Sequence, residues 1–445
     1  MTSVTEITKA TAGTTASRSD LQAAPEAAAR DTSVGRREHR LFLVAITFMA
    51  IPIADDNFVQ TEPGTSAADH LASGLVPLAA LAAIAVLYPR LPAGLRAATS
   101  LTFGALAVAV GIPGAYYIAD GTAQGDHYTA LLALAAAAIL LTLGPAILWR
   151  ARRRGGSRRR RYLLRASSVA VAIVAVPLVF VILVFPIAMP YVYVHAGKST
   201  PIRELGVGQI PARVVTSDGL DLEAAYVPSK NGAAVIVYPG ATRTEEALML
   251  VRHGYGVLLL VPRGQGRSEG DIVRWAGDRD LLAGADYLER RPDVEPGRIG
   301  AMGFSIGGEI LLETAAKSTA IDAIVSEGAG ERVGEVDASG PSRLLTDPAM
   351  AVMTGAVTLF GNTGPQPPIG DRIGLIAPRP VFLIYAVPGI GGEDYRQPLY
   401  YAAAGAPKEI WRVPGSEHTG GFEAQPAEYD RRVVEFFDGA LLGRR

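Results

Sequence analysis

A serine between two glycines is the strongest chemical signal in this sequence. Gly303–Gly307 reads Gly-Phe-Ser-Ile-Gly, follows a short apolar run and precedes a stretch with helical apolar periodicity. The pattern predicts a sharp strand-to-helix turn that exposes the Ser305 hydroxyl, because larger side chains two positions away would collide with the strand and the helix. A hydroxyl at such a turn becomes a nucleophile when a base, an orienting carboxylate and oxyanion donors surround it.

The same short pattern occurs a second time, at Gly266–Gly270, with Ser268 at its centre. This copy follows its predicted strand by several residues, and no helical periodicity begins at the serine. It therefore fails the structural context that the pattern requires. We interpret Gly266–Gly270 as a structural turn.

A base for Ser305 must come from one of six histidines. Four of them lie in or next to the strongly apolar first half of the chain, and His253 lies in a predicted helix. His418 alone lies in a loop after the last predicted strand, where an imidazole could reach across the ends of the strands. We expect His418 to be the base.

The orienting carboxylate should follow a strand between the serine and the histidine in the chain order of such triads. Glu393 ends a glycine-rich loop after the predicted strand at Val381–Tyr385, and Asp394 follows it directly. Glu327 comes directly after the preceding predicted strand. We favour Glu393, with Asp394 and Glu327 as alternatives.

Two backbone amides are candidates for the oxyanion hole. One is the amide of Ile306, directly after the serine. The other is the amide of Ala241, in the turn after the first long buried strand. Donors at these two places face the same reacting oxygen in this kind of site.

The composition indicates that a large part of the chain lies in a membrane. Hydrophobic residues make up 49% of the 445 residues and charged residues only 19%. The net charge of −1 argues against nucleic acid as a partner. The absence of cysteine excludes disulfides, thiol catalysis and cysteine-ligated metals.

The apolar residues predict a transmembrane domain over 39–195, after a disordered tail at 1–38. The first apolar run is short for a span, so a signal peptide is its alternative interpretation. The predicted helices are 41–54, 71–88, 97–118, 129–149 and 167–189.

An arginine-rich loop precedes the fifth predicted helix and sets the orientation. Residues 150–161 contain eight arginines, and such loops stay on the cytoplasmic side. Five spans then place everything after about residue 190 on the outer face of the membrane. Binding of the arginines to anionic headgroups is a second interpretation.

Short apolar runs alternate with amphipathic stretches from 201 to 445, which is typical of a parallel sheet covered by helices. An antiparallel hairpin is predicted at 212–228. The interval 328–379 is longer than one crossover needs, so we expect a small cap beside the site there. The further strands are predicted at 234–238, 256–261, 298–302, 323–326, 381–385 and 409–413.

Together these residues resemble the α/β-hydrolase superfamily, in its esterase, dienelactone-hydrolase and serine-aminopeptidase-like branches. The resemblance covers about 205–445 and rests on five motifs. They are Tyr238–Gly240, the turn at Gly256–Ser268, Gly303–Gly307, Ala377–Pro380 and Pro414–Thr419. The first, second and last of these stand where relatives carry a His-Gly turn, a D-x-R-G-x-G-x-S turn and the catalytic histidine. Val261 departs from the usual aspartate.

The resemblance implies an α/β-hydrolase fold behind an all-α transmembrane domain. It also implies that Ser305 attacks an ester, thioester or amide carbonyl while His418 takes the proton, with no metal or organic cofactor. The expected partners are a small-molecule or lipid-like acyl substrate and the membrane.

Four other functions fit parts of the sequence. A peptidase or an acyltransferase would use the same scaffold and the same residues. A non-catalytic binding module is a different class, and the presence of both serine and histidine argues against it. A transporter is disfavoured because the apolar spans show no internal repeat and no charges near their centres.

Overall fold

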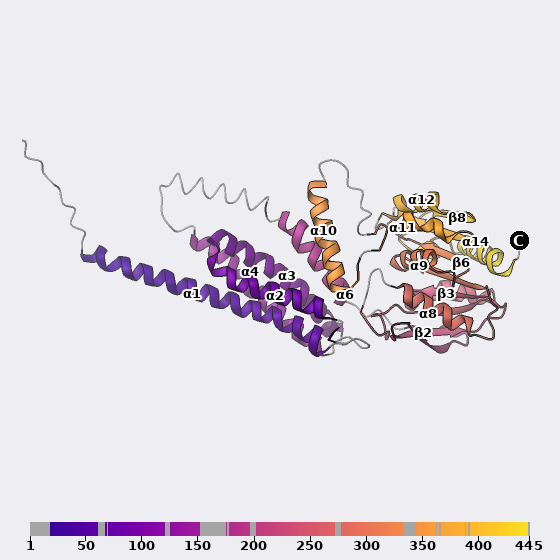
Figure 1. Ribbon diagram of the computed structural model, residues 1–445, viewed down its shortest axis with the longest axis horizontal. Coiled ribbons are helices and arrows are strands. Elements are labelled where there is room, and N and C mark those ends of the chain that lie inside the picture. Colours follow the sequence, from indigo (N-terminus) through magenta and orange to yellow (C-terminus); the bar gives the residue numbers. More distant parts are fainter. Residues whose placement is uncertain are drawn as a thin grey trace, which may run out of the picture.

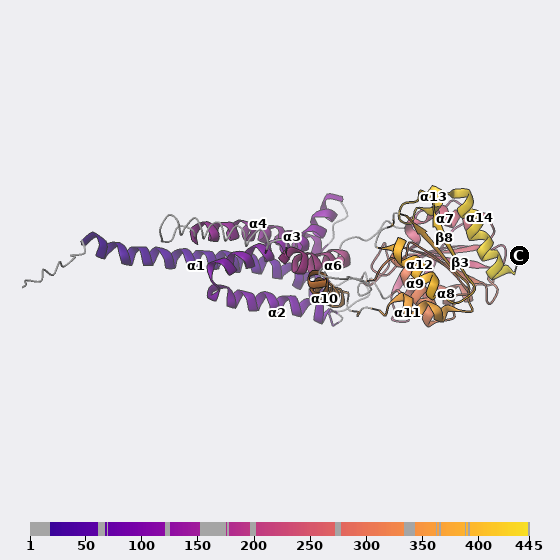
Figure 2. The ribbon, with the colours of Figure 1, turned by 90° about the horizontal axis from the view of Figure 1, so that it is seen from above.

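The computed structural model shows an elongated molecule with a helical domain at one end and a sheet-containing domain at the other (Figures 1 and 2). Helices α6 (Phe185–His195) and α10 (Arg343–Phe360) lie between the two. The structure describes residues 18–60, 67–68, 70–120, 125–151, 175, 178–195, 202–271, 277–332, 343–361, 363–364, 366–387, 389 and 392–443.

A single eight-stranded sheet forms the centre of the second domain, in the order β1-β2-β4-β3-β5-β6-β7-β8. The first two strands form the predicted antiparallel hairpin, β2 pairs antiparallel with β4, and every other neighbouring pair is parallel. The strands are β1 (Ile210–Val215), β2 (Asp221–Val227), β3 (Ala234–Tyr238), β4 (Gly256–Leu260), β5 (Ile299–Phe304), β6 (Ala323–Glu327), β7 (Val381–Ala386) and β8 (Lys408–Val413).

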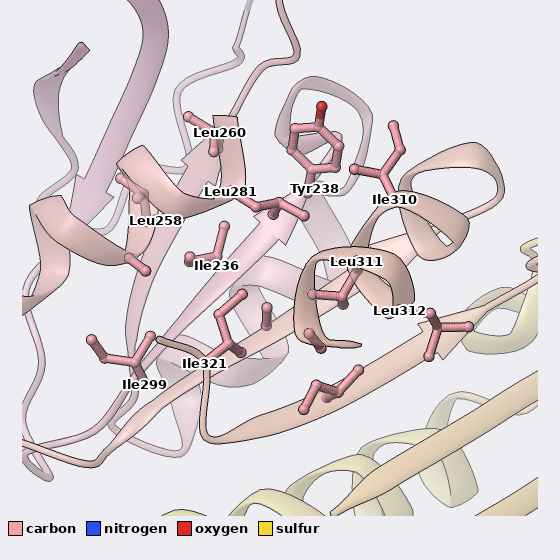
Figure 3. Packing of buried hydrophobic residues seen from close by; sticks show 14 of the residues in the cluster. Ile236, Tyr238, Leu258, Leu260, Leu281, Ile299, Ile310, Leu311, Leu312 and Ile321 are labelled. Atoms are coloured by element: carbon pink, nitrogen blue, oxygen red, sulfur yellow. The ribbon is translucent and has the colours of Figure 1, made fainter. Parts of the chain in front are cut away.

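Helices cover both faces of this sheet because its parallel strands are apolar on both sides. Along β3, Ile236 and Tyr238 pack toward α8 and α9, whereas Val235 and Val237 pack toward α7 and α14. Figure 3 shows the first of these two cores, with Ile236, Leu281 and Leu311 meeting between sheet and helices. The helices are α7 (Thr244–Arg252), α8 (Asp278–Glu289), α9 (Ile306–Lys317), α11 (Ile369–Arg372), α12 (Glu393–Ala403), α13 (Gly421–Ala424) and α14 (Pro426–Phe437).

The strand order, the antiparallel second strand and the two helical layers confirm the predicted α/β-hydrolase fold. All eight predicted strands are present, with boundaries that differ by at most two residues from those expected. In this fold the crossovers place the carboxyl ends of the parallel strands along one edge of the sheet. The loops that follow β3, β5, β6, β7 and β8 therefore meet there.

Among the described residues of the N-terminal domain, four helices are long and apolar enough to cross a membrane: 35–59, 71–90, 93–112 and 127–151. Alanines such as Ala45, Ala107 and Ala136 are fully buried between them, so the helices pack closely. These ranges fall within α1 (Arg18–Ala54) with η1 (Asp55–Val59), α2 (Leu71–Leu87) with η2 (Tyr88–Arg90), α3 (Ala93–Asp120) and α4 (Asp126–Ala151).

The predicted disordered tail is wrong over part of its length. Helix α1 begins at Arg18 and not after residue 38, while residues 1–17 lie outside the described part of the chain. Residues 21–30 contain five alanines with leucine, glutamine, glutamate and arginine, which are strong helix formers. A segment without apolar periodicity can be helical when its residues have high helix propensity and an apolar helix follows it directly.

The first and fifth predicted spans also differ from their expected extent. The first apolar helix runs from 35 to 59 and is long enough to span a bilayer, whereas the apolar run 41–54 alone is short. Of the fifth predicted span, 167–189, the structure describes only residue 175 and residues 178–189. Residues 180–184 form η3 (Phe180–Val184), and residues 185–189 are the first part of α6. The arginine-rich loop lies outside the described residues, so the orientation stays a prediction.

The interval 328–379 contains α10, and this helix packs against α6, η3 and α2 of the N-terminal domain. Helix α11 and the 3-10 turn η6 (Ile373–Ile376), later in the same interval, pack against α9. The sequence placed the whole interval beside the site, whereas α10 joins the apolar helices. Its function as a cap stays a prediction.

Candidate active site

Ser305 lies in the strand-to-helix turn that its flanking glycines predict. It follows β5, has φ 54° and ψ −124°, and precedes the first residue of α9. A Cβ at Gly303 would lie 2.6 Å from the Gly307 carbonyl oxygen, and one at Gly307 would lie 2.7 Å from the Tyr238 carbonyl oxygen. Both contacts are closer than a side chain tolerates, so the turn requires glycine at both positions.

Three side chains from separate loops form a continuous chain of hydrogen bonds. His418 Nε2 lies 2.9 Å from Ser305 Oγ, and His418 Nδ1 lies 2.9 Å from Glu393 Oε1. A carboxylate only accepts, so Nδ1 carries the hydrogen in the neutral imidazole and Nε2 can accept the serine proton. The arrangement has the geometry of a nucleophile, its base and the carboxylate that orients the base.

Glu393 is placed for this contact by α12, of which it is the first residue. Its side chain is fully buried, while that of His418 is 20% exposed. The first turn of a helix is a favourable position for an acidic side chain. The fold therefore holds this buried carboxyl group against the imidazole of His418.

The two alternative carboxylates do not approach His418. Glu327 is buried at the end of β6, where it accepts hydrogen bonds from the Gly421 amide at 2.8 Å and from the Tyr429 hydroxyl. Asp394 is exposed on α12. Among the three candidates from the sequence, the structure brings only Glu393 to the histidine.

The two predicted oxyanion donors lie on adjacent turns. Ala241 is buried in the 3-10 turn Gly240–Thr242 that follows β3, and Ile306 begins α9 after β5. Strands β3 and β5 are neighbours, with Tyr238 paired to Gly303. The first amides of a helix have no intrahelical acceptor, so the Ile306 amide can bind an oxyanion. That these two amides act as the hole stays a prediction.

Gly328 is a part of the site that the sequence reasoning missed. Its φ is +70°, and a Cβ there would lie 3.1 Å from His418 Cε1 and 3.1 Å from Glu393 Oε2. The backbone at this residue therefore packs directly against the histidine and its carboxylate. The available signal was a glycine immediately after a buried strand, in Ser326-Glu327-Gly328.

Arg243 is a second missed residue, and it fixes the loop that carries His418. Its guanidinium donates to the Thr419 carbonyl oxygen at 3.0 Å and to Thr419 Oγ1 at 2.8 Å. The same group lies 4.1 Å above the Phe304 ring. Arg243 thus joins the residue after the histidine to the residue before the serine. No local pattern could reveal a contact between residues so far apart in the chain.

Glu327 holds the other side of the same loop, and its environment predicts a pH-dependent stability. Burial raises its pKa to about 7 from the ordinary 4.5, because desolvation penalises the carboxylate. Below about pH 4.5 both folded and unfolded chains hold the proton, so the stabilisation is complete there. It is lost as the pH rises through about 7, because the unfolded chain releases the proton first.

We therefore expect the free energy of unfolding of Glu327→Gln to increase relative to that of wild type as the pH rises from about 4.5 to about 7. The expected increase is up to about 3 kcal/mol. The neutral amide keeps an acceptor for the Gly421 amide and has no proton to release. Thermal unfolding midpoints of both proteins in detergent, at about pH 5 and about pH 8, measure this. If the two proteins differed in unfolding midpoint by the same amount at both pH values, the raised pKa of Glu327 would be contradicted.

The second copy of the serine pattern is a structural turn, as its context predicts. Ser268 is buried, donates to the Val261 carbonyl oxygen at 2.9 Å and accepts from the Glu223 amide at 2.9 Å. Its hydroxyl therefore joins the loop after β4 to β2. Both of its bonds go to backbone groups, and neither goes to a histidine.

One hydrolase family matches part of the chain. The sequence model of the X-Pro dipeptidyl-peptidase (S15 family) matches residues 192–367. This range includes Ser305 and ends before Glu393 and His418. The match supports a serine-type hydrolase and leaves the bond that is cleaved open.

The curated relatives are themselves uncharacterized proteins. One from Mycobacterium tuberculosis (strain H37Rv) is 33% identical over 107 residues, which are 22% of this chain and 38% of that protein. YfhR of Escherichia coli (strain K12) is 24% identical over 246 residues, covering 50% of this chain and 78% of YfhR. The chain thus spans well under half the length of the Mycobacterium relative, so activity and substrate are matters for proposal.

Two solved structures with similar folds each cover little more than half of the chain. The Pyrococcus furiosus esterase Pf2001 is 19% identical, with a TM-score of 0.45, and covers 55% of this chain and 100% of its own. The α/β hydrolase GrgF from a Penicillium species is 19% identical, with a TM-score of 0.43, and covers 53% and 99%. By its own sheet order and strand-to-helix turn, the second domain has the α/β-hydrolase fold, and it follows an N-terminal domain of apolar helices that fit a membrane domain.

Proposed function

We propose that the protein is a membrane-anchored serine hydrolase that cleaves carboxylic esters through an acyl-enzyme on Ser305. The observation that carries this proposal is the hydrogen-bonded series Ser305–His418–Glu393, with both contacts at 2.9 Å. The serine is held at a strained turn, and the carboxylate is buried. This combination is typical of nucleophilic catalysis by serine.

In the proposed reaction Ser305 Oγ forms a bond to the substrate carbonyl carbon while His418 Nε2 takes the serine proton. The amides of Ile306 and Ala241 stabilise the negative oxygen of the tetrahedral intermediate. The bond to the leaving alcohol then breaks, and His418 returns the proton to that alcohol. Water attacks the acyl-enzyme with His418 again as the base, which releases the acid and restores the serine.

A peptidase is the second candidate, and the match to the S15 family over 192–367 favours it. The same three side chains would attack an amide, with His418 protonating the leaving amine. An acyltransferase would replace the attacking water by another acceptor. Turnover of matched ester and amide substrates by one preparation separates the esterase from the peptidase. An esterase releases an alcohol from the ester, and a peptidase releases an amine from the amide.

The proposed location is the outer face of the membrane. Four apolar helices of sufficient length support membrane insertion. The orientation rests on the arginine-rich loop and on a fifth span. Protease treatment of intact cells should therefore cut the hydrolase domain, and a protected domain would reverse the orientation.

A fluorophosphonate probe tests the proposal directly, because it reacts with an activated serine and leaves other serines unmodified. We expect the full-length protein in detergent to be labelled and Ser305→Ala to remain unlabelled. Ser268→Ala is the matched control, since it removes the serine of the second Gly-x-Ser-x-Gly copy, and it should label like wild type. Equal labelling of wild type and Ser305→Ala would refute the proposal.

A further inference from the structure

An apolar cavity of about 420 Å³ lies at the junction of the two domains, away from the serine. Helices α1, α2, α3 and α6 of the N-terminal domain form its walls together with α10. Met49, Leu81, Phe103 and Ile187 are typical of the lining, which is apolar over most of its surface. Cavities of this size accommodate small ligands.

The hydrolase domain contributes one wall of this cavity. Helix α10 is inserted between β6 and β7, and its residues Val352, Ala356 and Phe360 line the cavity. Their spacing places them on one face of the helix. The Phe360 ring meets the Tyr191 ring of α6 edge-on, with centroids 5.2 Å apart. The cavity is therefore shared between the apolar domain and the domain that contains Ser305.

Arg332 links both chain segments that flank α10 to α9, the helix that follows Ser305. Arg332 is buried, and its guanidinium pairs with Glu313 of α9 and donates to the Glu309 carbonyl oxygen at 2.9 Å. The same guanidinium donates to the Pro367 carbonyl oxygen at 3.2 Å, on the returning segment. The seven steps along the chain from Phe360 to Pro367 span at most about 25 Å. The cavity end at Phe360 thus lies within that distance of Pro367, which the Arg332 side chain links to α9.

Two polar side chains of the lining, Asn57 and Ser73, lie where α1 and α2 are connected. Ser73 Oγ donates to Asn57 Oδ1 at 2.6 Å. Just before Ser73, His70 Nδ1 lies 3.8 Å from Oδ2 of Asp271, in the loop beyond β4. The end of the cavity at Asn57 and Ser73 is therefore close in the chain to a residue that contacts the hydrolase domain.

We propose that this cavity binds the hydrocarbon chain of a long-chain lipid ester and that such esters are the substrates of Ser305. The cavity has the polarity of an amphiphile: apolar walls for the chain and polar side chains at the end formed by Asn57 and Ser73. Helices that cross a bilayer expose such a cavity to lipid. One leaflet of the hydrocarbon core is about 15 Å deep, and the ester of a lipid lies at its surface. The inference rests on the proposed function, because it names the substrate class of that site.

Photolabelling tests the binding without requiring turnover. A palmitate ester with a diazirine at the end of its chain is irradiated with the full-length protein in detergent, and the labelled peptides are identified. We expect label in peptides from α2, α3, α6 and α10. Ala356→Trp fills the cavity from α10, and Ala80→Phe fills it from α2. Both should reduce the label in these peptides at least tenfold.

Ala351→Trp is the matched control, because Ala351 lies on α10, is exposed and does not line the cavity. It should label like wild type. If Ala356→Trp does not give a monodisperse protein, Ala80→Phe decides, since Ala80 is exposed and tolerates a larger side chain. Equal labelling of wild type and Ala80→Phe would overturn the proposal.

Chain-length dependence tests whether the bound chain belongs to the substrate. For p-nitrophenyl palmitate, kcat/KM should fall by about tenfold or more in both cavity variants. For p-nitrophenyl butyrate it should stay within about twofold of wild type, because a short chain does not reach the cavity. An unchanged ratio of the two rates would refute the substrate assignment and leave the ester-hydrolase proposal intact. Failure of fluorophosphonate labelling would refute the hydrolase proposal and with it the substrate assignment, whereas photolabelling of the cavity would still report whether the hydrocarbon chain binds there.

Discussion

Replacing Glu393 by glutamine should lower kcat for ester hydrolysis by about 10⁴-fold while the protein remains folded. The carboxylate accepts the Nδ1 hydrogen of His418 and stabilises the imidazolium that forms when the serine proton is taken. A glutamine amide can donate to Nδ1, which favours the tautomer whose Nε2 carries the hydrogen and cannot accept from Ser305. The rate of p-nitrophenyl butyrate hydrolysis in detergent measures the loss.

The other two carboxylates from the sequence serve as matched controls. Glu327→Gln and Asp394→Asn remove the same charge without touching His418, and each should keep kcat within about tenfold of wild type. If Glu327→Gln or Asp394→Asn reproduced the 10⁴-fold loss, Glu393 would not be the orienting acid. Unfolding midpoints of all three variants separate a catalytic effect from loss of the fold.

The second large effect is expected at Gly328, where alanine should reduce kcat/KM by about tenfold to 100-fold. The added methyl carbon would lie 3.1 Å from both His418 Cε1 and Glu393 Oε2 and 2.8 Å from Thr419 Cγ2. The Thr419 methyl group must move, and His418 and Glu393 must give by a few tenths of an ångström. A displacement of about 1 Å in a catalytic group costs about 10²-fold, which sets the upper end of this range. Labelling by the fluorophosphonate probe should slow in parallel.

Gly415→Ala is the control for backbone strain at Gly328. Gly415 has φ +71°, almost the same as the +70° of Gly328, and lies in the loop that leads to His418. A Cβ at Gly415 would meet no described atom within 4 Å. Both variants incur the left-handed penalty of about 1–2 kcal/mol. Equal activity losses in the two would show that strain, and not contact with the triad, causes the effect.

The sheet and the serine turn could be predicted because their signals are local. Apolar runs separated by glycine and proline determine β3 to β8, and the steric demand of the elbow falls on residues two positions from Ser305. The histidine was found by elimination and chain order. These features depend on residue type and short spacing, which a single sequence displays.

The remaining features depend on contacts between distant residues. The sequence favours Glu393 only slightly over Asp394 and Glu327, because all three follow predicted strands, and only the three-dimensional path of the loops separates them. The bond from Arg243 to Thr419 crosses 176 positions of the chain. The packing of α10 against α6 cannot be predicted from the local sequence either. An apolar helix has the same sequence pattern whether it covers an active site or packs against a membrane domain.

The hydrogen bond between Arg332 and the Pro367 carbonyl oxygen has a consequence for the architecture of the chain. The bond holds Arg332 and Pro367 together beside α9, so the two ends of the segment that contains α10 lie close to each other. The entropic cost of closing a loop rises slowly with its length, by about 0.6 kcal/mol for each doubling. A longer or shorter segment between these two ends should therefore change the stability of the sheet little.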